Sequence, residues 1–510
     1  MSSEIEFDYA IIGAGVGGLF AGALLARAGK SVYVAEKHYA LGGYGHSFKK
    51  SKFDFCAQLH YLWNCLPGEP GHAIFQKLGL AADVPFVRLN ENGFDHVYFP
   101  GRRFEIRRGF DKNETELSRL YPAEKATIRK YFGIIASIND AILTLPIDCD
   151  ATHFALHPFR TFPLIRYYGY TLQELFDELK ISEELQNILA GQSGNLLAPP
   201  STVSLFIHAG MVAGYDRGAC VPEKGFRHLF TEVARVILSK SGNRITTRNE
   251  ALGLAFENGK MIGIRTKREG LVRAKHVILN SDPKHLPEWL PTGAVTSKFE
   301  ERLKYSYSPS NFTVYLGLKD IDLMQHGFGN WNIWFYQKDS VNQVYEDQLV
   351  RNDLGAPSLF ISTPTLHAPG GAQGERKGAP PGGQQMVLCT MCNYARFKEL
   401  LIKDRVLYEE EKYALTQRML DVVEDNFVPG LRKHITVCIS GSPTTNERYV
   451  NSPYGNSYGA DLTPANFKLG RLNSKTPLHN LHLVGAAAGV PSFAGGIHFA
   501  NLLAEKLLSA

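Results

Sequence analysis

The apolar positions near the start of the chain form two short strands on either side of an apolar helix. Residues 7–12 (FDYAII) and 31–36 (SVYVAE) are typical of buried strands. Residues 19–30 (LFAGALLARAGK) between them are apolar and helix-forming, and Gly29 marks the end of the helix. The order of strand, helix and strand predicts a βαβ unit.

Glycines at fixed spacing follow the first of these strands. Gly13 permits the tight turn, Gly15 lets the backbone approach a pyrophosphate, and Gly18 lets the helix pack closely on the sheet. Glu36 ends the second strand, where its carboxylate can accept hydrogen bonds from a ribose. This order predicts a dinucleotide site with phosphates at the helix N-terminus. Its expected residues are Gly13, Gly15, Gly17, Gly18, Glu36 and Lys37.

A second group of glycines lies just after this acid, in residues 37–48 (KHYALGGYGHSF). NAD dehydrogenases do not require it. The segment resembles one in a large flavoprotein family that includes amine oxidases and phytoene desaturases, in which such glycines let the backbone pass beneath the flavin and its phosphates. The resemblance implies FAD as the cofactor. It places Gly42, Gly43, His46 and Ser47 at the flavin phosphates or ring.

The C-terminal segment, residues 480–508, predicts a short strand, a glycine-rich turn and an amphipathic helix. In the same flavoproteins this segment closes the cofactor site, and a helix N-terminus there stabilises the negative charge of a reduced flavin. The resemblance places Gly485, Gly495, Gly496 and Ile497 at the flavin. Many relatives have an acidic residue after the first of these glycines, whereas Ala486 and Ala487 follow it here. Weaker or differently arranged binding is expected at that point.

The strand and helix signals divide the chain into two interleaved domains. We expect an α/β fold, α+β overall, with a Rossmann-type FAD-binding domain that is discontinuous in sequence. It is assigned to residues 1–95, 215–290 and 472–510, and an inserted mixed-sheet and helical substrate domain to residues 96–214 and 291–471. No second glycine motif of this kind follows a strand, so no dedicated NAD(P)H domain is expected. Electrons must then pass through the substrate, a quinone, dioxygen or a diffusible donor.

The composition of the chain excludes some classes of binding partner. A net charge of +5 over 510 residues, without a basic run, argues against nucleic acid. No stretch approaches the ~20 apolar residues that span a bilayer, and the first strand begins near residue 7. We therefore expect no signal or transit peptide, and a location in the cytoplasm or at the periphery of a membrane. Seven cysteines are too sparse for a disulfide framework, and the pair Cys389 and Cys392 has no second pair to complete a metal site, so no metal is expected.

Two segments have unusual composition. Residues 157–170 (HPFRTFPLIRYYGY) mix arginine with five aromatic residues, which suits a membrane interface, although an aromatic lid over a pocket or ordinary packing gives the same pattern. Residues 367–385 are rich in Gly, Pro and Gln and predict a mobile surface loop. Peripheral membrane contact is therefore one hypothesis for the first segment.

Two stretches far apart resemble the retinol saturase and carotenoid isomerase branch of the phytoene desaturase family. The first runs from Glu36 through the glycine pair and His46 to an FD…HY element. That element consists of Phe53, Asp54, His60 and Tyr61. The second is residues 441–464 (GSPTTNERYVNSPYGNSYGADLTP). The resemblance implies an FAD-dependent enzyme that saturates, desaturates or isomerises carbon–carbon double bonds of a hydrophobic polyene or similar lipid.

Saturating a double bond requires a hydride on one carbon and a proton on the other, with the flavin supplying the hydride. His60 is the first candidate for the proton donor, because relatives place its element beside the flavin ring. A histidine that only orders the loop or bonds the flavin fits equally. Tyr61, His46 and His498 are alternates, and Tyr305 and Tyr307 border the tunnel or serve packing.

Two other functions use the same fold. The first is an oxidase or dehydrogenase of an amine or unsaturated lipid, because fold alone does not fix the substrate. The second is a non-catalytic lipid-binding escort protein, since the related Rab escort and GDP-dissociation-inhibitor proteins bind prenyl groups without redox chemistry. The intact glycines and Glu36 argue against the escort function.

Overall fold

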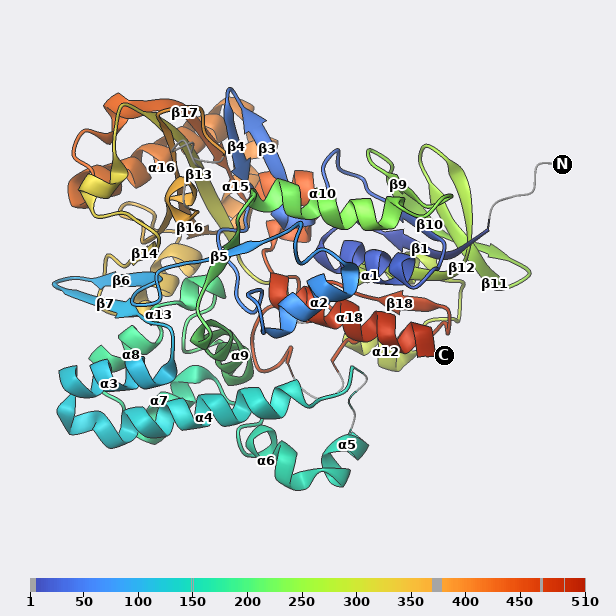
Figure 1. Ribbon diagram of the computed structural model, residues 1–510, viewed down its shortest axis with the longest axis horizontal. Helices are drawn as coiled ribbons and strands as arrows, with labels where there is room; N and C mark the ends of the chain where they lie inside the picture. The colour runs from blue at the N-terminus through green and yellow to red at the C-terminus, as the bar shows by residue number, and fades with distance from the viewer. Residues whose placement is uncertain are drawn as a thin grey trace.

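The computed structural model describes residues 6–147, 149, 151–368, 378–467, 471–489 and 491–509. In this part of the chain the strands form two seven-stranded sheets and two short two-stranded sheets. The first large sheet lies on the same side of the molecule as the C-terminal helix, and the second lies on the opposite side (Figure 1).

The first large sheet contains the predicted βαβ unit. Its strand order is β10-β11-β12-β1-β2-β9, and β18 pairs with β12. β1 is parallel to β2 and β12, whereas β10 and β11 form an antiparallel hairpin beside β12. The strand bounds are β1 (Glu6–Ile12), β2 (Val32–Ala35), β9 (Arg244–Thr246), β10 (Ala251–Glu257), β11 (Lys260–Thr266), β12 (Gly270–Leu279) and β18 (Leu481–Leu483).

Helices cover both faces of this sheet, because its strands point apolar side chains alternately to each face. Ile11 and Val34 pack in a buried cluster with α1, α2, α10 and α18. Ala10 and Tyr33 pack on the opposite face with α11 and α12. The helix bounds are α1 (Val16–Arg27), α2 (Pro70–Leu78), α10 (Gly225–Leu238), α11 (Leu286–Trp289), α12 (Ser297–Arg302) and α18 (Phe493–Ser509).

The second large sheet has the order β17-β13-β16-β15-β14-β6-β7, and its pairs are antiparallel except for β14 with β6. Phe312 and Leu316 of β13 pack with α15 and α16. Tyr315 points to the other face, against the β3–β4 hairpin. The bounds are β3 (Ser47–Lys50), β4 (Phe53–Cys56), β6 (Asp95–Phe99), β7 (Arg102–Ile106), β13 (Ser310–Lys319), β14 (Asn332–Phe335), β15 (Leu359–Ser362), β16 (Gly383–Cys392), β17 (Ile435–Gly441), α15 (Tyr394–Lys403) and α16 (Arg405–Asn426).

A layer of helices lies beside the second sheet, at the lower left of Figure 1. Its side chains share one apolar cluster with Val97 of β6 and Trp334 of β14. α4 is central to this layer, because it contacts α3, α6 and α9. None of the helices in the described residues is both long and apolar enough to cross a membrane. The bounds are α3 (Phe110–Leu120), α4 (Lys125–Leu143), α5 (Ala151–Leu156), α6 (Pro158–Arg166), α7 (Leu172–Leu179), α8 (Glu183–Leu189) and α9 (Leu205–Asp216).

The two large sheets draw on different segments of the chain. The first takes its strands from residues 6–35, 244–279 and 481–483, and the second from residues 95–106 and 310–441. The domain bounds at 95, 215, 290 and 472 stay a prediction. Of the expected loop 367–385, residues 369–377 lie outside the described residues, and the last three belong to β16. The remaining bounds are β5 (Phe86–Arg88), β8 (Cys220–Pro222), α13 (Val341–Tyr345), α14 (Pro364–His367) and α17 (Pro443–Val450).

Candidate functional site

The turn between β1 and α1 brings backbone into very close contact. Gly13 has a φ of 94°, and its N–H donates to the carbonyl of Ala35 at 2.8 Å. A Cβ on Gly18 would lie 2.3 Å from the carbonyl oxygen of Gly13, so only glycine fits there without a shift of the turn. Gly15 is the N-cap of α1, and Gly15 and Gly17 line a cavity at the helix N-terminus. The turn therefore presents helix N–H groups to an anion.

Asn280, which immediately follows β12, supports this turn. Its side-chain amide donates to the carbonyl of Gly13 at 3.3 Å and also lies against Gly15 and Gly485. One carboxamide thus contacts the glycine turns at both ends of the chain. Asn280 was not predicted as a site residue, although its position just past a parallel strand was a usable signal.

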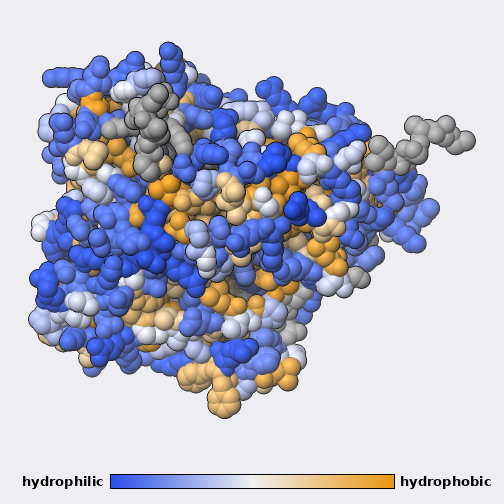
Figure 2. Space-filling view, viewed as in Figure 1, coloured by the Kyte–Doolittle hydropathy of each residue, from blue (hydrophilic) through white to orange (hydrophobic). Residues whose placement is uncertain are grey.

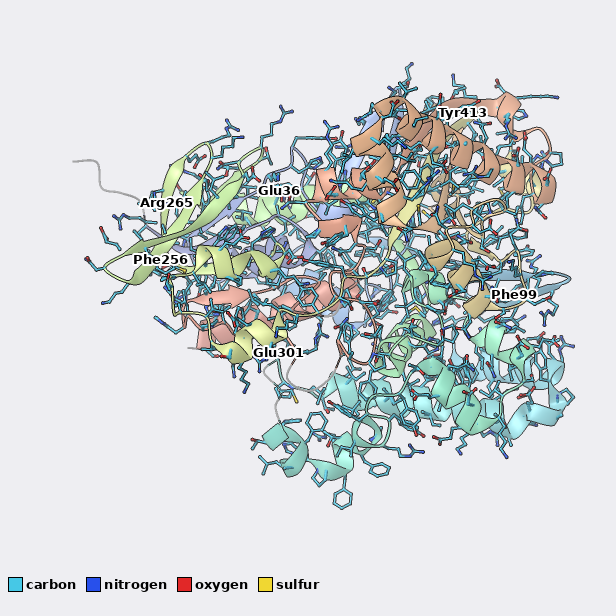
Figure 3. The ribbon with its side chains drawn as sticks, turned by 180° about the vertical axis from the view of Figure 1, so that it is seen from behind. Glu36, Phe99, Phe256, Arg265, Glu301 and Tyr413 are labelled. Atoms are coloured by element: carbon cyan, nitrogen blue, oxygen red, sulfur yellow. The ribbon has the colours of Figure 1, made fainter. Side chains whose placement is uncertain are left out.

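Glu36 follows β2 at the rim of the same cavity, near the middle of the molecule (Figure 3). Its carboxylate accepts backbone N–H groups of Ala14 and His38, each at 2.7 Å. Burial raises the pKa of Glu36, and these hydrogen bonds oppose that rise. Lys37 also lines the cavity and pairs with Glu250 at 2.7 Å. The glutamate is held in place by the backbone and remains at the cavity surface, where a ribose can bond it.

The second glycine pair packs against the first turn. The N–H of Gly42 donates to the carbonyl of Ala14 at 2.8 Å, and both Gly42 and Gly43 line the cavity. His46 and Ser47 are buried and are not among the lining residues. The Nδ1 of His46 lies 2.7 Å from the carbonyl oxygen of Gly43, and burial lowers the pKa of this histidine. His46 therefore supports the loop from behind.

The C-terminal segment closes the opposite side of the cavity. Gly485, Ala486 and Ala487 line it, as do Phe493 and Gly496 at the start of α18. Ser492 accepts the N–H of Gly495 through its hydroxyl at 2.8 Å and the N–H of Gly496 through its carbonyl at 2.9 Å. Neither Gly495 nor Ile497 is among the lining residues, and Ile497 is buried on the face of α18 that packs in the cluster with α1 and α2.

A half-buried arginine holds the turn that lacks the expected acid. Arg471 donates to the carbonyls of Gly489 and Ala487 at 2.7 and 3.3 Å. Burial lowers the pKa of Arg471 to about 10, so its guanidinium is charged at neutral pH. The turn thus has a guanidinium cation against its carbonyl groups.

These turns border a single cavity of about 570 Å³ that continues into the second half of the molecule. Its far lobe is bounded by side chains from the helical layer and the second large sheet, all of which belong to one apolar cluster. These residues are Leu196, Leu197, Met211, Trp334, Phe360 and Met391. The cavity therefore joins a polar end, suited to phosphates and ribose, to an apolar end, suited to hydrocarbon.

His60 lies on the cavity wall between the two ends. Its Nε2 is 3.6 Å from the Sγ of Cys389, and its ring packs against Phe360. Burial lowers the pKa of His60 from 6.5 to about 3. The imidazole is therefore neutral at pH 7, and its charged form is not available there as an acid.

Tyr61 belongs to a buried polar network that the sequence did not reveal. Its hydroxyl donates to Asp95 at 2.7 Å and accepts from the amide of Asn195 at 2.8 Å. Asp95 is fully buried and also accepts from Gln192 at 2.6 Å. Burial raises the pKa of Asp95 to about 6, although the hydrogen bonds from Gln192 and Tyr61 oppose that rise. Burial and the neighbouring Asp95 charge raise the pKa of Tyr61 well above its ordinary value.

The remaining candidates lie elsewhere. His498, Tyr305 and Tyr307 are not among the lining residues, and the ammonium of Lys284 lies 4.3 and 4.1 Å from the ring centroids of the two tyrosines. Cys389 lines the cavity as a free thiol, and Cys392 is buried on the same strand. In the described ranges no group of three or more His, Cys, Asp or Glu side chains is arranged to hold a metal.

The observed cradle fits FAD. The glycine turns leave no room for a Cβ at Gly15 or Gly18, a helix N-terminus faces the cavity, and a carboxylate stands at its rim. When bound there, FAD would be held by Gly13, Gly15, Gly42, Gly43 and Glu36 at its nucleotide end. The carry-over of individual contacts to these residues stays a prediction.

Comparisons with known proteins agree with this geometry. The chain is 26% identical to an all-trans-retinol 13,14-reductase of Danio rerio, over 96% of this chain and 84% of that protein. It is 23% identical to a chloroplastic prolycopene isomerase of Daucus carota, over 94% and 76% of the two chains. A solved structure of putrescine oxidase bound to putrescine superposes with a TM-score of 0.65 at 14% identity, covering 99% of this chain and all of the other, and shares the fold.

The family comparison covers most of the chain. The sequence model of the family described as flavin containing amine oxidoreductase matches residues 16–434, which include Glu36, the glycine pair Gly42 and Gly43, His60 and Tyr61. The chain belongs to the flavin-containing amine oxidoreductase family, and its cofactor is FAD.

Proposed function

We propose that this protein is an FAD-dependent oxidoreductase that acts on a carbon–carbon double bond of a polyene isoprenoid, by saturation or by redox-assisted isomerisation. The observation that carries the proposal is the cavity, which runs from the dinucleotide cradle into an apolar lobe lined by Leu197, Met211 and Phe360. A long hydrocarbon gains free energy by leaving water for such a lobe. The two named relatives, a retinol reductase and a prolycopene isomerase, act on molecules of this kind.

The chain itself binds and orients the substrate. The apolar lobe excludes water from the polyene and holds it against the end of the cavity where the cofactor lies. FAD supplies the transfer of two electrons to or from carbon when it is bound. Met391 and Cys389 come from one strand and Leu196 from the helical layer, so the substrate contacts both structural layers of the second half.

Saturation also needs a proton for the second carbon. Tyr61 is the better donor of the two predicted residues, because it lines the cavity with a hydroxyl that is protonated at pH 7, whereas His60 is a neutral imidazole there. The O–H bond of Tyr61 breaks as the C–H bond forms, the resulting phenolate keeps the hydrogen bond from Asn195, and a proton from water restores the phenol. In this proposal His60 is a positioning residue on the cavity wall.

The alternative is oxidation of an amine or another unsaturated lipid on the same fold. Mixing the protein with an amine and with a polyene distinguishes this alternative from the proposed reaction. Oxidised, FAD-loaded protein is mixed with putrescine in air, and separately its chemically reduced form is mixed anaerobically with all-trans-retinol in detergent micelles. The proposal expects the polyene to be saturated or rearranged and putrescine to leave the flavin oxidised. Bleaching of the flavin by putrescine with release of hydrogen peroxide, and no change in retinol, would overturn it.

A further inference from the structure

Large apolar side chains are exposed together at the edge of the helical layer. On α5, α6 and the turn after them, Phe159 is 96% exposed, Leu156 71% and Phe162 62%. We call Leu156, Phe159, Phe162, Ile165 and Tyr168 the α5–α6 surface. Figure 2 shows hydrophobic residues gathered at the lowest edge of the molecule, where α5 and α6 lie in Figure 1. Such gatherings mark contact sites on soluble proteins.

α6 is apolar on both of its faces. Thr161 and Leu164 are buried against the helical layer, while Phe159, Phe162 and Ile165 point outward at helical spacing. A helix packed on a protein surface normally turns a polar face to water. The outward face of α6 instead has the composition of a helix that lies in the boundary between lipid headgroups and acyl chains.

The charge on this surface is positive. The sequence from residue 151 to residue 173 contains Arg160 and Arg166 and no aspartate or glutamate. Arg166 is paired with Glu178 at 2.8 Å, whereas Arg160 is exposed between the two outward phenylalanines. Asp148 and Asp150 precede the segment and lie outside the described residues. An exposed arginine between inserted aromatic rings complements an anionic headgroup.

The inward face of α6 belongs to the apolar cluster that also borders the cavity. Leu164 shares this cluster with Leu197 and Met211, which line the far lobe. α6 contacts α4, α4 contacts α9, and α9 carries Met211. A bilayer held at α6 would therefore lie on the side of the molecule that forms the apolar end of the cavity.

We propose that the α5–α6 surface docks on a lipid bilayer with anionic headgroups. Phe159 and Phe162 insert at the level of the upper acyl chains, and Arg160 contacts the headgroups. The protein attaches to one leaflet without spanning it. Docking concerns the location of the enzyme and does not depend on the reaction proposed above.

The test is flotation of the FAD-loaded protein with vesicles. Vesicles of phosphatidylcholine alone are compared with vesicles that also contain phosphatidylserine, and the bound fraction is measured. Wild type is expected to float with both and to bind the anionic vesicles more tightly. Phe159→Ser/Phe162→Ser is expected to bind about tenfold more weakly or worse, since each ring loses most of its apolar transfer free energy. Arg160→Glu is expected to weaken binding to the anionic vesicles selectively.

A matched control removes two equally exposed apolar residues elsewhere. Ile402 is 75% exposed on α15 and Val406 62% exposed on α16. α16, marked by Tyr413 in Figure 3, lies at the opposite end of the molecule from α6. Ile402→Ser/Val406→Ser is expected to bind vesicles like wild type. Equal flavin absorbance and Tm in all variants check that they are folded.

Two results would overturn the proposal. The first is a flotation result in which wild type binds neither kind of vesicle, or in which Phe159→Ser/Phe162→Ser and Ile402→Ser/Val406→Ser lose binding equally. The second is light scattering without lipid in which wild type is a dimer and Phe159→Ser/Phe162→Ser is a monomer, because the α5–α6 surface would then contact a second copy of the chain. The vesicle readout is independent of turnover, so it is unaffected if the substrate proposal fails.

Discussion

The hydroxyl of Tyr61 donates a 2.7 Å hydrogen bond to the carboxylate of Asp95, and both groups are buried. This pair joins the segment after the β3–β4 hairpin, where Tyr61 lines the cavity, to β6 of the second large sheet. A carboxylate in this position is costly to ionise, and its hydrogen-bond donors recover part of that cost. The pair thus places a carboxylate with a raised pKa of about 6 behind the cavity wall at Tyr61.

Asp95 makes stability depend on pH. Its folded pKa of about 6 lies above the ordinary 3.8, so the folded protein binds the proton more tightly than the unfolded chain does. Wild type therefore loses stability as the pH rises from about 4 to about 6, by roughly 3 kcal/mol in all. Asp95→Asn lacks this loss. Its Tm relative to wild type, measured by calorimetry on FAD-loaded proteins, is expected to rise across this window, and a difference independent of pH would contradict the assignment.

Tyr61→Phe provides a second test of the pair. The variant removes one donor from Asp95, so the pKa of this carboxyl is expected to rise further. The pH window in which stability falls should extend to higher pH, because its upper end follows the folded pKa of Asp95 while its lower end is set by the unfolded chain; Tm is measured again, against Asp95→Asn/Tyr61→Phe. An unchanged window would mean that the hydroxyl does not act on the carboxylate.

His60 is expected to affect the rate without setting its pH dependence. With a pKa of about 3, its imidazole does not titrate between about pH 5 and 8. His60→Ala should bind FAD and lose most turnover, because the wall beside Cys389 and Phe360 loses its ring. The pH profile of kcat/KM should keep its shape. A limb near 6.5 in wild type that disappears in His60→Ala would show that this histidine titrates during turnover.

The close approach at the first turn predicts a loss of cofactor. Gly18→Ala puts a Cβ 2.3 Å from the Gly13 carbonyl, and Gly15→Ala puts one 2.8 Å from the Asn280 amide, inside the cradle. Each is expected to weaken FAD binding by about tenfold or more, measured by quenching of flavin fluorescence. Gly133→Ala is the control: nothing lies within 4 Å of its Cβ position in the middle of α4, and it should bind FAD normally and gain up to about 1 kcal/mol in stability.

The apolar lobe predicts a variant that separates substrate from cofactor. Met211→Trp adds volume where α9 borders the lobe, far along the cavity from the glycine turns. Retinol binding is expected to weaken by about tenfold while FAD binding is unchanged, because the larger indole side chain overpacks only the apolar lobe. Met324→Trp, at an exposed position, is the matched control. Equal loss of FAD and retinol in Met211→Trp would contradict a separate substrate lobe.

Local patterns explain why the cofactor half was predictable. The strand, turn and helix around Gly13, Gly15 and Gly18 are adjacent in sequence, and their chemistry depends on neighbours within a few residues. The site around Asp95 was not predictable, because Gln192 is 97 residues away and Tyr61 34 residues away. From sequence alone, an aspartate at the start of a strand is expected to be exposed to solvent, and only tertiary contacts show that Asp95 is buried.

The same limit applies to residues placed by resemblance. His46 and Ser47 were assigned to the flavin, and the fold puts both behind the glycine loop, outside the cavity lining. His60 and Cys389 meet across 329 residues, which no spacing in the sequence indicates. The exposed face of α6 was visible as a composition, but only the fold separates its outward phenylalanines from the buried Leu164.

A polyene is expected to react at the flavin of this protein. The direct measurement is an anaerobic titration in which FAD-loaded protein is reduced chemically, retinol or a carotenoid is added in detergent micelles, and flavin absorbance and products are followed together. The flavin is expected to be reoxidised with one double bond of the polyene saturated, or the polyene is expected to be isomerised while the flavin stays reduced. A flavin that stays reduced with both polyenes recovered unchanged would contradict it.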